Sequence, residues 1–109
     1  DYITVHVPLL DSTRGLFSTA QFARMKPNAI FINTARGEVV DEPALIAALQ
    51  KGEIAGAGLD VYEAEPPNHP ELLALDNVVL CPHIGAATRE ALTRMTVQAA
   101  EMIIEALKD

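Results

Sequence analysis

Three residues that could act together on a small anionic ligand each follow a short apolar segment of this sequence. Arg36 follows the segment 30–33, Glu65 comes soon after the segment 55–59, and His83 follows the segment 78–81. In an open parallel sheet the carboxyl ends of the strands share one edge, and ligands bind in the crevice beside it. The sequence therefore predicts that a guanidinium, a carboxylate and an imidazole meet at one edge of a sheet.

Arg36 has the chemistry of a carboxylate binder. Its planar fork of N–H donors matches a carboxylate, and each charge-assisted hydrogen bond contributes about 1.5–3 kcal/mol. Gly37 follows it, so the guanidinium can leave the strand end and enter a crevice. The alternative, which the spacing leaves open, is a surface arginine that pairs with Glu38 or Asp41.

His83 and Glu65 are candidates for proton transfer. A carboxylate beside a histidine stabilises the charged imidazole and makes it a proton donor near neutral pH. Two prolines follow Glu65, and this stiff segment could direct the carboxylate toward His83, with Glu63 as the competing acid. The alternatives are a histidine whose ring nitrogens bind backbone groups and an acid that is simply solvated in a loop.

Further polar and small residues accompany these three. Asp60 ends the third apolar segment and could accept hydrogen bonds from a ligand or a loop, while His69 is expected in an exposed loop. Small side chains and free backbone groups would let a flat cofactor approach closely. The residues concerned are Thr34, Ala35, Gly85 and Ala86, and His6 could form part of the crevice floor.

Composition and charge exclude several classes of protein. A chain of 109 residues, half of them apolar, can form one domain with a single core. Fifteen acidic residues against eight basic ones give a net charge of −7, which argues against a broad nucleic-acid or anionic membrane surface. Any anionic ligand must therefore be held by a local cation.

The single cysteine, and the lack of an apolar run long enough to span a membrane, indicate the compartment in which the protein is expected. Cys81 cannot form an internal disulfide and is expected as a small buried apolar residue, and no metal-ligand spacing is present. The sequence shows neither a secretory leader nor a membrane-spanning run. We therefore expect a soluble, cytoplasmic protein without a metal centre.

Strands and helices alternate along the predicted structure. Buried strands are expected at 3–7, 29–32, 55–59 and 78–81, and helical segments after Ser18, between Asp41 and Gly52, at 71–75 and from Thr88 onward. Asp41 as N-cap, Pro43 in the first turn and Gly52 just past the end mark the second helix most clearly. This alternation predicts an α/β fold with a parallel sheet and right-handed crossovers.

The last helix, about residues 88–108, carries an apolar face without a later partner in the sequence. Residues at three- and four-residue spacing form it: Leu92, Met95, Ala99, Met102, Ile103 and Leu107. Such a face, together with an unpaired sheet edge, should drive self-association. We therefore expect a homo-oligomer, or a chain that belongs to a larger fold.

Several common catalytic motifs are missing from the sequence. It has no nucleophile elbow, no Walker loop and no zincin histidine pair. The nearest match to a dinucleotide fingerprint is Gly56-Ala57-Gly58, but Val61 takes the place of the third glycine and no helix is expected to open there. An unrelated flavodoxin-like domain remains an alternative that the convergence of Arg36, Glu65 and His83 would distinguish.

Taken together, the motifs strongly resemble the D-isomer-specific 2-hydroxyacid dehydrogenases. The resemblance spans the whole chain, and its last two motifs are most similar to the glyoxylate/hydroxypyruvate reductase branch. The motifs are His6-Val7-Pro8-Leu9, Lys26-Pro27-Asn28-Ala29, Asn33-Thr34-Ala35-Arg36-Gly37, Val39-Val40-Asp41-Glu42, Gly58-Leu59-Asp60-Val61-Tyr62, Glu65-Pro66, Asn68-His69-Pro70 and Pro82-His83-Ile84-Gly85-Ala86-Ala87-Thr88.

This resemblance implies an oxidoreductase that uses NAD or NADP and a small 2-oxo acid such as glyoxylate or hydroxypyruvate. It implies that Arg36 binds the oxo acid, that His83 protonates the carbonyl oxygen, and that Glu65 pairs with His83. It further implies a cofactor crevice formed by His6, Thr34, Ala35, Arg36, Asp60, His83 and Gly85, with Asp60 near the nicotinamide and His6 on the adenosine side.

The resemblance also implies parts that these 109 residues do not contain. Members of the family have a substrate domain and the first half of the dinucleotide-binding fold upstream, including its glycine-rich phosphate loop. Residues 1–109 resemble the second half of the Rossmann-like domain plus a long C-terminal helix, so the chain alone is expected to be nearly inactive. The alternative is a non-catalytic cofactor-binding or scaffold module.

Overall fold

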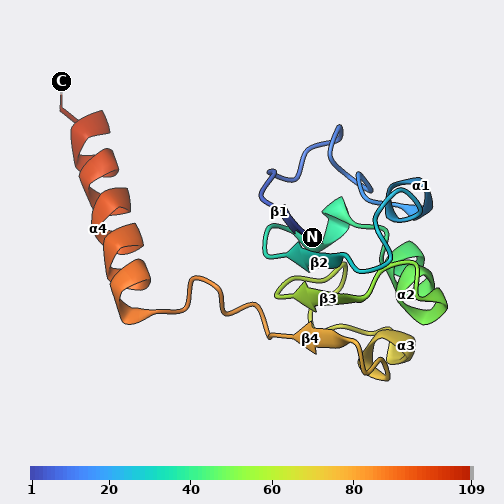
Figure 1. The fold of residues 1–109 in the computed structure, drawn as a ribbon. Coiled ribbons are helices and arrows are strands. Elements are labelled where there is room, and N and C mark those ends of the chain that lie inside the picture. Colours follow the sequence, from blue (N-terminus) through green and yellow to red (C-terminus); the bar gives the residue numbers. More distant parts are fainter. Residues whose placement is uncertain (109) are drawn as a thin grey trace.

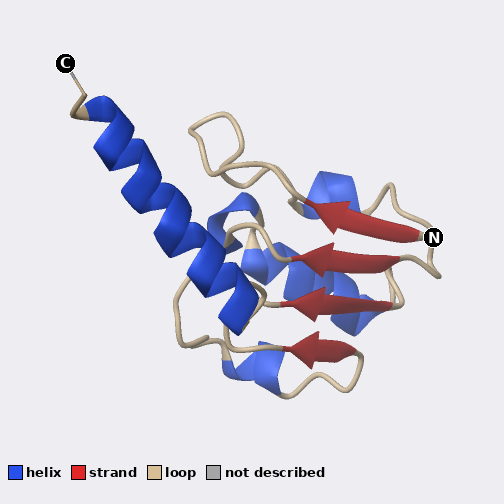
Figure 2. Ribbon diagram, turned by 90° about the vertical axis from the view of Figure 1, so that its left-hand side faces the viewer, coloured by secondary structure: helices blue, strands red, loops and turns tan. Residues whose placement is uncertain are grey.

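The core of the structure, a computed structural model that describes residues 1–108, is a parallel four-stranded sheet. Its strands are β1 (Tyr2–Val5), β2 (Ile30–Asn33), β3 (Gly56–Leu59) and β4 (Val78–Leu80), and they lie side by side in sequence order. Figure 2 shows that all four strands point the same way. The predicted α/β class with a parallel sheet is confirmed.

Three helices cover one face of this sheet. They are α1 (Thr19–Phe22), α2 (Glu42–Lys51) and α3 (Pro70–Leu73), all on the same side of the strands in Figure 1. The core lies between them and the sheet, with its largest fully buried apolar side chains at Phe22, Phe31, Leu45, Ile54 and Leu72. The other face is open, since Tyr2 and Val79 are well exposed.

The helix α2 forms where the sequence predicts it. The Asp41 side chain accepts a hydrogen bond from the backbone N–H of Ala44 at 3.1 Å, which satisfies one of the free donors of the first turn. Gly52 ends the helix in the left-handed region at φ 68°. Leu45 and Leu49 are buried in the core. The capping residues and the apolar side chains therefore define the same helix.

The first strand is shorter than predicted. β1 ends at Val5, which pairs with Asn33, the last residue of β2. The Asn33 side chain then bonds the backbone of Ala35 and Arg36 and turns the chain away. His6 and Val7, which were expected in the strand, therefore have no neighbouring strand to pair with and belong to the loop.

The shorter elements shift only slightly from the predicted ones. Ser18 precedes α1 as predicted, but this helix has just four residues, and α3 begins one residue early, at Pro70. A 3-10 helix, η1 (Gly37–Val39), was not predicted. It lies directly after Arg36 and leads into the N-terminus of α2.

The last helix, α4 (Arg89–Ala106), stands apart from the core. Thr88 caps it by accepting a hydrogen bond from the backbone N–H of Ala91, as the predicted start at this residue requires. Figure 1 shows α4 on the side of the sheet opposite to α1, α2 and α3. None of its residues is buried, and Met102, Ile103 and Leu107 are 73%, 61% and 76% exposed. The predicted apolar face exists, but none of its residues is buried within the described chain.

Candidate active site

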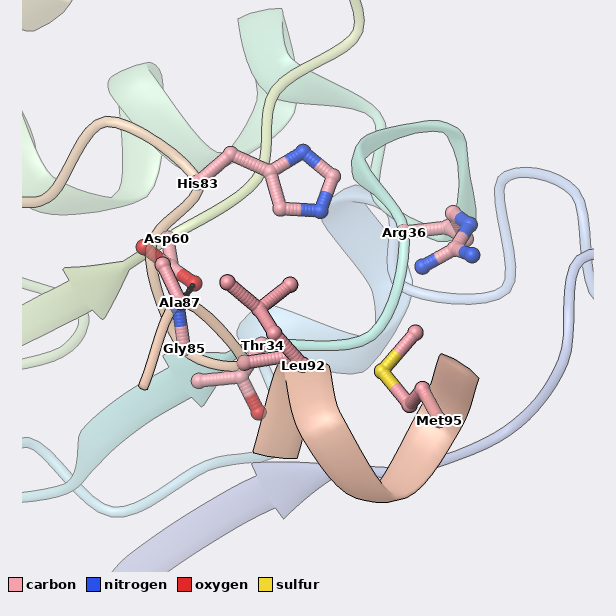
Figure 3. Close-up of a pocket in the computed structure, with 9 residues that line it drawn as sticks. Thr34, Arg36, Asp60, His83, Gly85, Ala87, Leu92 and Met95 are labelled. Carbon is pink, nitrogen blue, oxygen red and sulfur yellow. Dashed lines mark hydrogen bonds between the residues drawn. The ribbon is translucent and has the colours of Figure 1, made fainter. Parts of the chain in front are cut away.

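The loops that follow β2, β3 and β4 surround one cavity at the carboxyl edge of the sheet. It has a volume of about 550 Å³. Figure 3 shows His83 and Arg36 on opposite sides of this hollow, with Thr34 and the first turns of α4 below them in the view. Its lining residues are Thr34, Arg36, Asp60, His83, Gly85, Ala86, Ala87, Leu92 and Met95.

His83 and Glu65 form a hydrogen-bonded pair. The distance from His83 Nδ1 to Glu65 Oε2 is 2.7 Å, and the two side chains are 47% and 40% exposed. The hydrogen bond from His83 is the main cause that lowers the pKa of Glu65, and the Tyr62 N–H, 3.3 Å from Glu65 Oε1, acts in the same direction. Glu65 is therefore a carboxylate at neutral pH, so Nδ1 carries the shared proton.

The pairing of His83 decides between the alternatives that the sequence left open. Its imidazole is bound by a side-chain carboxylate rather than by backbone groups, and the partner is Glu65 rather than Glu63. Because Glu65 uses its second oxygen to accept from the Tyr62 backbone, the carboxylate is held at both ends. His83 itself adopts the left-handed backbone region at φ 54°, which is uncommon for a residue with a side chain.

Arg36 leaves the end of β2 without an acidic partner. Within residues 1–108 neither Glu38 nor Asp41 forms a salt bridge with it, so the alternative of a paired surface arginine is wrong. The guanidinium Nη1 instead donates to the backbone oxygen of Ala35 at 2.7 Å. The Arg36 side chain is exposed and lines the cavity, so its remaining donors can receive an anion.

The loop that carries Arg36 is organised by a buried asparagine. Asn33 is 1% exposed, its Nδ2 donates to the Arg36 carbonyl at 3.0 Å, and its Oδ1 accepts from the Ala35 N–H at 3.0 Å. A buried side-chain amide bonded at both ends fixes the turn that follows it. Sequence reasoning did not assign Asn33 a role, although a polar residue at the end of an apolar strand is a signal for one.

Gly37 lets two of the site's loops touch. A Cβ atom at this position would collide with the backbone carbonyl of Tyr62, so only glycine permits the contact. The loop of Arg36 and the loop of Glu65 therefore meet backbone to backbone. This close approach, which the sequence alone did not predict, sets the position of Arg36 relative to the His83–Glu65 pair.

Asp60 holds the loop that follows His83. It is 7% exposed, and its two carboxylate oxygens accept from the backbone N–H groups of Ile84 and Gly85 at 2.8 and 2.7 Å. A Cβ on Gly85 would lie 2.8 Å from Asp60 Oδ2, which explains the glycine. Of the two roles that the sequence left open for Asp60, the structure shows the bond to a loop.

Tyr62 joins the ends of β3 and β4. Its hydroxyl donates to the Cys81 carbonyl at 2.7 Å, with the Leu59 carbonyl at 3.1 Å sharing the proton. Burial is the largest cause that raises the pKa of Tyr62, so the hydroxyl keeps its proton. Cys81 is only half-buried, which corrects the expectation of a fully buried residue, because β4 is the edge strand of the sheet.

A second hollow continues the cavity toward β1. Its volume is about 570 Å³, and Thr34 and Arg36 line both this hollow and the cavity beside His83. His6 belongs to its wall, with Nε2 at 2.8 Å from Thr4 Oγ1. Part of the lining of these two hollows consists of small residues, namely Thr34, Ala35, Gly85, Ala86 and Ala87.

Two residues of α4 complete the wall of the cavity. Leu92 and Met95 lie on the first turns of the helix and contribute apolar surface opposite the sheet edge (Figure 3). The sequence places them on an apolar face but gives no reason to connect them with His83. The connection depends on where the loop after β4 directs α4.

A second histidine–carboxylate pair lies outside this crevice. His69 was expected in an exposed loop, but its side chain is 32% exposed and Nε2 lies 3.7 Å from Oε2 of Glu42. Glu42 is 3% exposed. His69 lies in a loop as predicted, but its side chain is half-buried beside this carboxylate rather than exposed. The pair was missed because nothing in the spacing of the two residues connects them; it is created by the loop that joins β3 to α3.

The structure also bears on membranes: none of the helices within residues 1–108 is both long and apolar enough to span a bilayer.

Comparison with known proteins defines the class first. The family described as "D-isomer specific 2-hydroxyacid dehydrogenase, NAD binding domain" matches residues 1–85. Because this match covers most of the chain, the chain belongs to that family. The predicted resemblance is confirmed, and the predicted cofactor class, NAD or NADP, agrees with it.

Individual relatives show which members of the family the chain is similar to. The chain is 55% identical over 109 residues to a glyoxylate/hydroxypyruvate reductase B from Citrobacter koseri, covering 99% of this chain and 34% of the relative. It is 40% identical to a D-lactate dehydrogenase structure from Sporolactobacillus, with a TM-score of 0.87, 98% of this chain and 36% of that one covered.

A third relative was solved with a cofactor. It is an NADPH-dependent glyoxylate/hydroxypyruvate reductase from Sinorhizobium meliloti in complex with NADP and malonate, 43% identical, with a TM-score of 0.80 over 84% of this chain and 28% of that one. Our chain thus spans about a third of the length of the curated relatives that it matches.

Proposed function

We propose that this chain supplies the catalytic side chains of an NAD(P)-dependent reductase of small 2-oxo acids, with glyoxylate or hydroxypyruvate as substrate. The observation that carries the proposal is the His83–Glu65 pair, 2.7 Å from nitrogen to oxygen, facing Arg36 across one cavity. A cation for the substrate carboxylate and a proton donor for its carbonyl are the two groups that such a reduction needs.

Arg36 binds the carboxylate of the oxo acid in this proposal. No acidic side chain within the described residues neutralises it, and the net charge of the chain is −7, so it is the local cation that an anionic substrate requires. Its hydrogen bond to the Ala35 carbonyl directs the guanidinium plane, while Asn33 fixes the backbone beneath it. The fork geometry then orients the substrate as well as holding it.

His83 donates the proton to the carbonyl oxygen, and Glu65 holds the imidazole in the donating orientation. With Nδ1 bound to Glu65, Nε2 is left to face the substrate. The carboxylate stabilises the imidazolium before the proton leaves, and proton donation by a positioned acid contributes about 10²–10⁴-fold to the rate. The nicotinamide supplies the hydride when it is bound.

The crevice residues position the cofactor in this proposal. His6, Thr34, Ala35, Asp60 and Gly85 are the proposed contacts, together with Arg36 and His83. Asp60 accepts hydrogen bonds from the backbone N–H groups of Ile84 and Gly85. We assign it the role of holding these two residues beside the site of the nicotinamide ring. The Sinorhizobium relative holds NADP and another D-lactate dehydrogenase, from Lactobacillus jensenii, holds NAD+, so both remain candidates.

We further propose that residues 1–109 form the second half of a cofactor domain, working with a substrate domain and a first half like those of longer relatives. The open β1 edge and the uncovered face of α4 are surfaces to which such parts, or a second copy of the chain, could bind. By this proposal, the chain alone turns over little, it self-associates, and its compartment is the cytoplasm.

A chimaera tests the catalytic assignment directly. In it, this chain replaces the aligned residues of the Citrobacter koseri relative, and oxidation of NADPH and NADH is followed with glyoxylate and hydroxypyruvate. We expect turnover, and a loss of kcat of about 10²–10⁴-fold in His83→Gln. Arg36→Ala should chiefly raise KM for the oxo acid.

Arg24→Ala is the matched control, because Arg24 is exposed and lines neither of the two hollows. Equal rates for His83→Gln and the parent chimaera would remove the proposed proton donor. Tight binding of cofactor by this chain, combined with a chimaera that never turns over, would favour the non-catalytic module instead.

A further inference from the structure

Glu42, Glu63 and His69 form a cluster away from the crevice. One carboxylate oxygen of each glutamate and one ring nitrogen of the histidine all lie within 4.8 Å of one another. Glu42 is the first residue of α2, while Glu63 and His69 lie on the segment between β3 and α3. The cluster therefore connects two elements that follow different strands of the sheet.

The orientation of Glu42 is fixed by reciprocal hydrogen bonds. Its Oε1 accepts from the Glu63 N–H at 2.6 Å, and its own N–H donates to Glu63 Oε1 at 3.1 Å. These bonds use one oxygen of each carboxylate. The second oxygen of Glu42 points toward His69, at 3.7 Å from Nε2.

That second oxygen is a buried acceptor without a partner. Glu42 is 3% exposed, and its Oε2 has no hydrogen-bond donor in the described chain. A buried carboxylate oxygen left unsatisfied is costly, and native proteins usually supply such a group with a donor or an ion. A neutral imidazole at 3.7 Å is too distant for a hydrogen bond.

We propose that Glu42, Glu63 and His69 bind a first-row divalent cation of the zinc class. Two carboxylate oxygens and one imidazole nitrogen are three protein ligands, and exposed positions on the side of Glu63 and His69 leave room for water as a fourth. The imidazole selects against magnesium and calcium, which prefer oxygen ligands alone.

The geometry needs only a local contraction. Zinc lies about 2.0–2.2 Å from oxygen and nitrogen ligands, so neighbouring ligand atoms approach to about 3.4 Å. Glu42 is held in place, whereas Glu63 is exposed and His69 is half-buried, so rotation of these two side chains can close the site. No backbone movement is required of α2.

Electrostatics also favours a cation at this position. The N-terminus of α2 carries about half a positive charge, but two carboxylates outweigh it, and Asp41 and Glu63 already occupy its N–H groups. Within residues 1–108 no lysine or arginine forms a salt bridge with either glutamate. Burial raises the pKa of Glu42, and the neighbouring charge of Glu63 acts in the same direction.

A bound cation would tie the Glu65 loop to α2. Glu65 lies between Glu63 and His69 in the sequence, so a metal that joins these two closes a short ring around it. The inference does not depend on the proposed reaction, because the three ligands lie outside the crevice. It makes the cluster a structural or regulatory site beside the catalytic pair.

Calorimetric titration of the metal-free chain with ZnCl₂ tests the proposal, with visible absorption of added Co²⁺ as a second readout. We expect one Zn²⁺ for each chain and binding at least about tenfold weaker in His69→Gln and Glu63→Gln. Glu42→Gln should also weaken Zn²⁺ binding. If this variant of a buried residue fails to fold, the His69 and Glu63 variants remain informative, because they change less buried side chains.

The matched controls are His83→Gln and Glu71→Gln, which change a histidine of the other pair and an exposed acid on α3. Both should keep the parent affinity. Loss of binding in His83→Gln with retention in His69→Gln would overturn the proposal, as would equal affinity for Mg²⁺ or no heat of binding for Zn²⁺ in the parent chain.

Discussion

The molecule contains two histidine–carboxylate pairs that differ in burial and in contact. His83 and Glu65 are both partly exposed and lie 2.7 Å apart, whereas Glu42 is 3% exposed and lies 3.7 Å from His69. The pKa of Glu65 is lowered by its hydrogen bond to His83, and that of Glu42 is raised by burial. The two glutamates therefore have opposite protonation tendencies, because hydrogen bonding dominates at Glu65 and desolvation at Glu42.

The two pairs share one segment of the chain. Residues 62–69 follow β3 and carry Glu63 toward α2 and Glu65 toward His83. Two residues spaced like Glu63 and Glu65 would lie on the same face of a regular extended strand, but the backbone bends at residues 63–66, so the two carboxylates reach different partners. Changes to this segment should therefore affect both, while changes within one pair should not.

The largest effect is expected from Gly37→Ala. The added Cβ would collide with the Tyr62 carbonyl at the start of the shared segment, so the backbone must move and both pairs should be disturbed. We expect a loss of about 3 kcal/mol or more in the free energy of unfolding, measured by urea denaturation.

Gly58→Ala is its matched control, since a Cβ there meets only Ile32 Cγ1 at 4.0 Å. This variant should lie within about 1 kcal/mol of the parent. If both alanine variants had the same stability, the close approach of the two loops would not matter for the site.

A smaller and more selective effect is expected from Glu65→Gln. The neutral amide removes one charge-assisted hydrogen bond, which contributes about 1.5–3 kcal/mol, so kcat of the chimaera should fall about ten- to hundredfold. Steady-state assays should show this loss with KM for the oxo acid little changed. Glu71→Gln is the control, and a Glu65→Gln variant as fast as Glu71→Gln would argue against the positioning role.

The smallest effect concerns the pH dependence of stability, where the two pairs should show opposite signs. The folded pKa of Glu65 lies below its ordinary value of 4.5, so its contribution to stability is present above pH 4.5 and is lost as the pH falls through the folded pKa. The folded pKa of Glu42 lies above 4.5, so the folded state loses stability as the pH rises from 4.5 through that value.

Denaturation of Glu65→Gln and Glu42→Gln across the acidic range checks these signs. Relative to Glu65→Gln, the parent should gain stability as the pH rises, and relative to Glu42→Gln it should lose stability over the window above pH 4.5. Slopes of the same sign for both variants would mean that burial does not control Glu42.

Local signals in the sequence were sufficient for most of the framework. The four apolar segments, the Asp41 cap and Gly52 predicted the parallel sheet and α2 because strand pattern and helix ends depend on neighbouring residues. Arg36, Glu65 and His83 could be placed at one edge because parallel strands bring their carboxyl ends together. The early end of β1 could not be predicted, because β1 loses its pairing partner where the neighbouring strand β2 turns away after Asn33.

By itself, then, the sequence determined the class of fold and the family, and it predicted that Arg36 and His83 line one crevice, as they do. Only the tertiary structure decided that Glu42 and His69 meet, that Asp60 holds the loop after His83, and that Gly37 brings two loops into contact. The physical reason is range: periodicity and capping act over a few residues. A contact between loops depends instead on the packed position of every element between them, and no local pattern records that position.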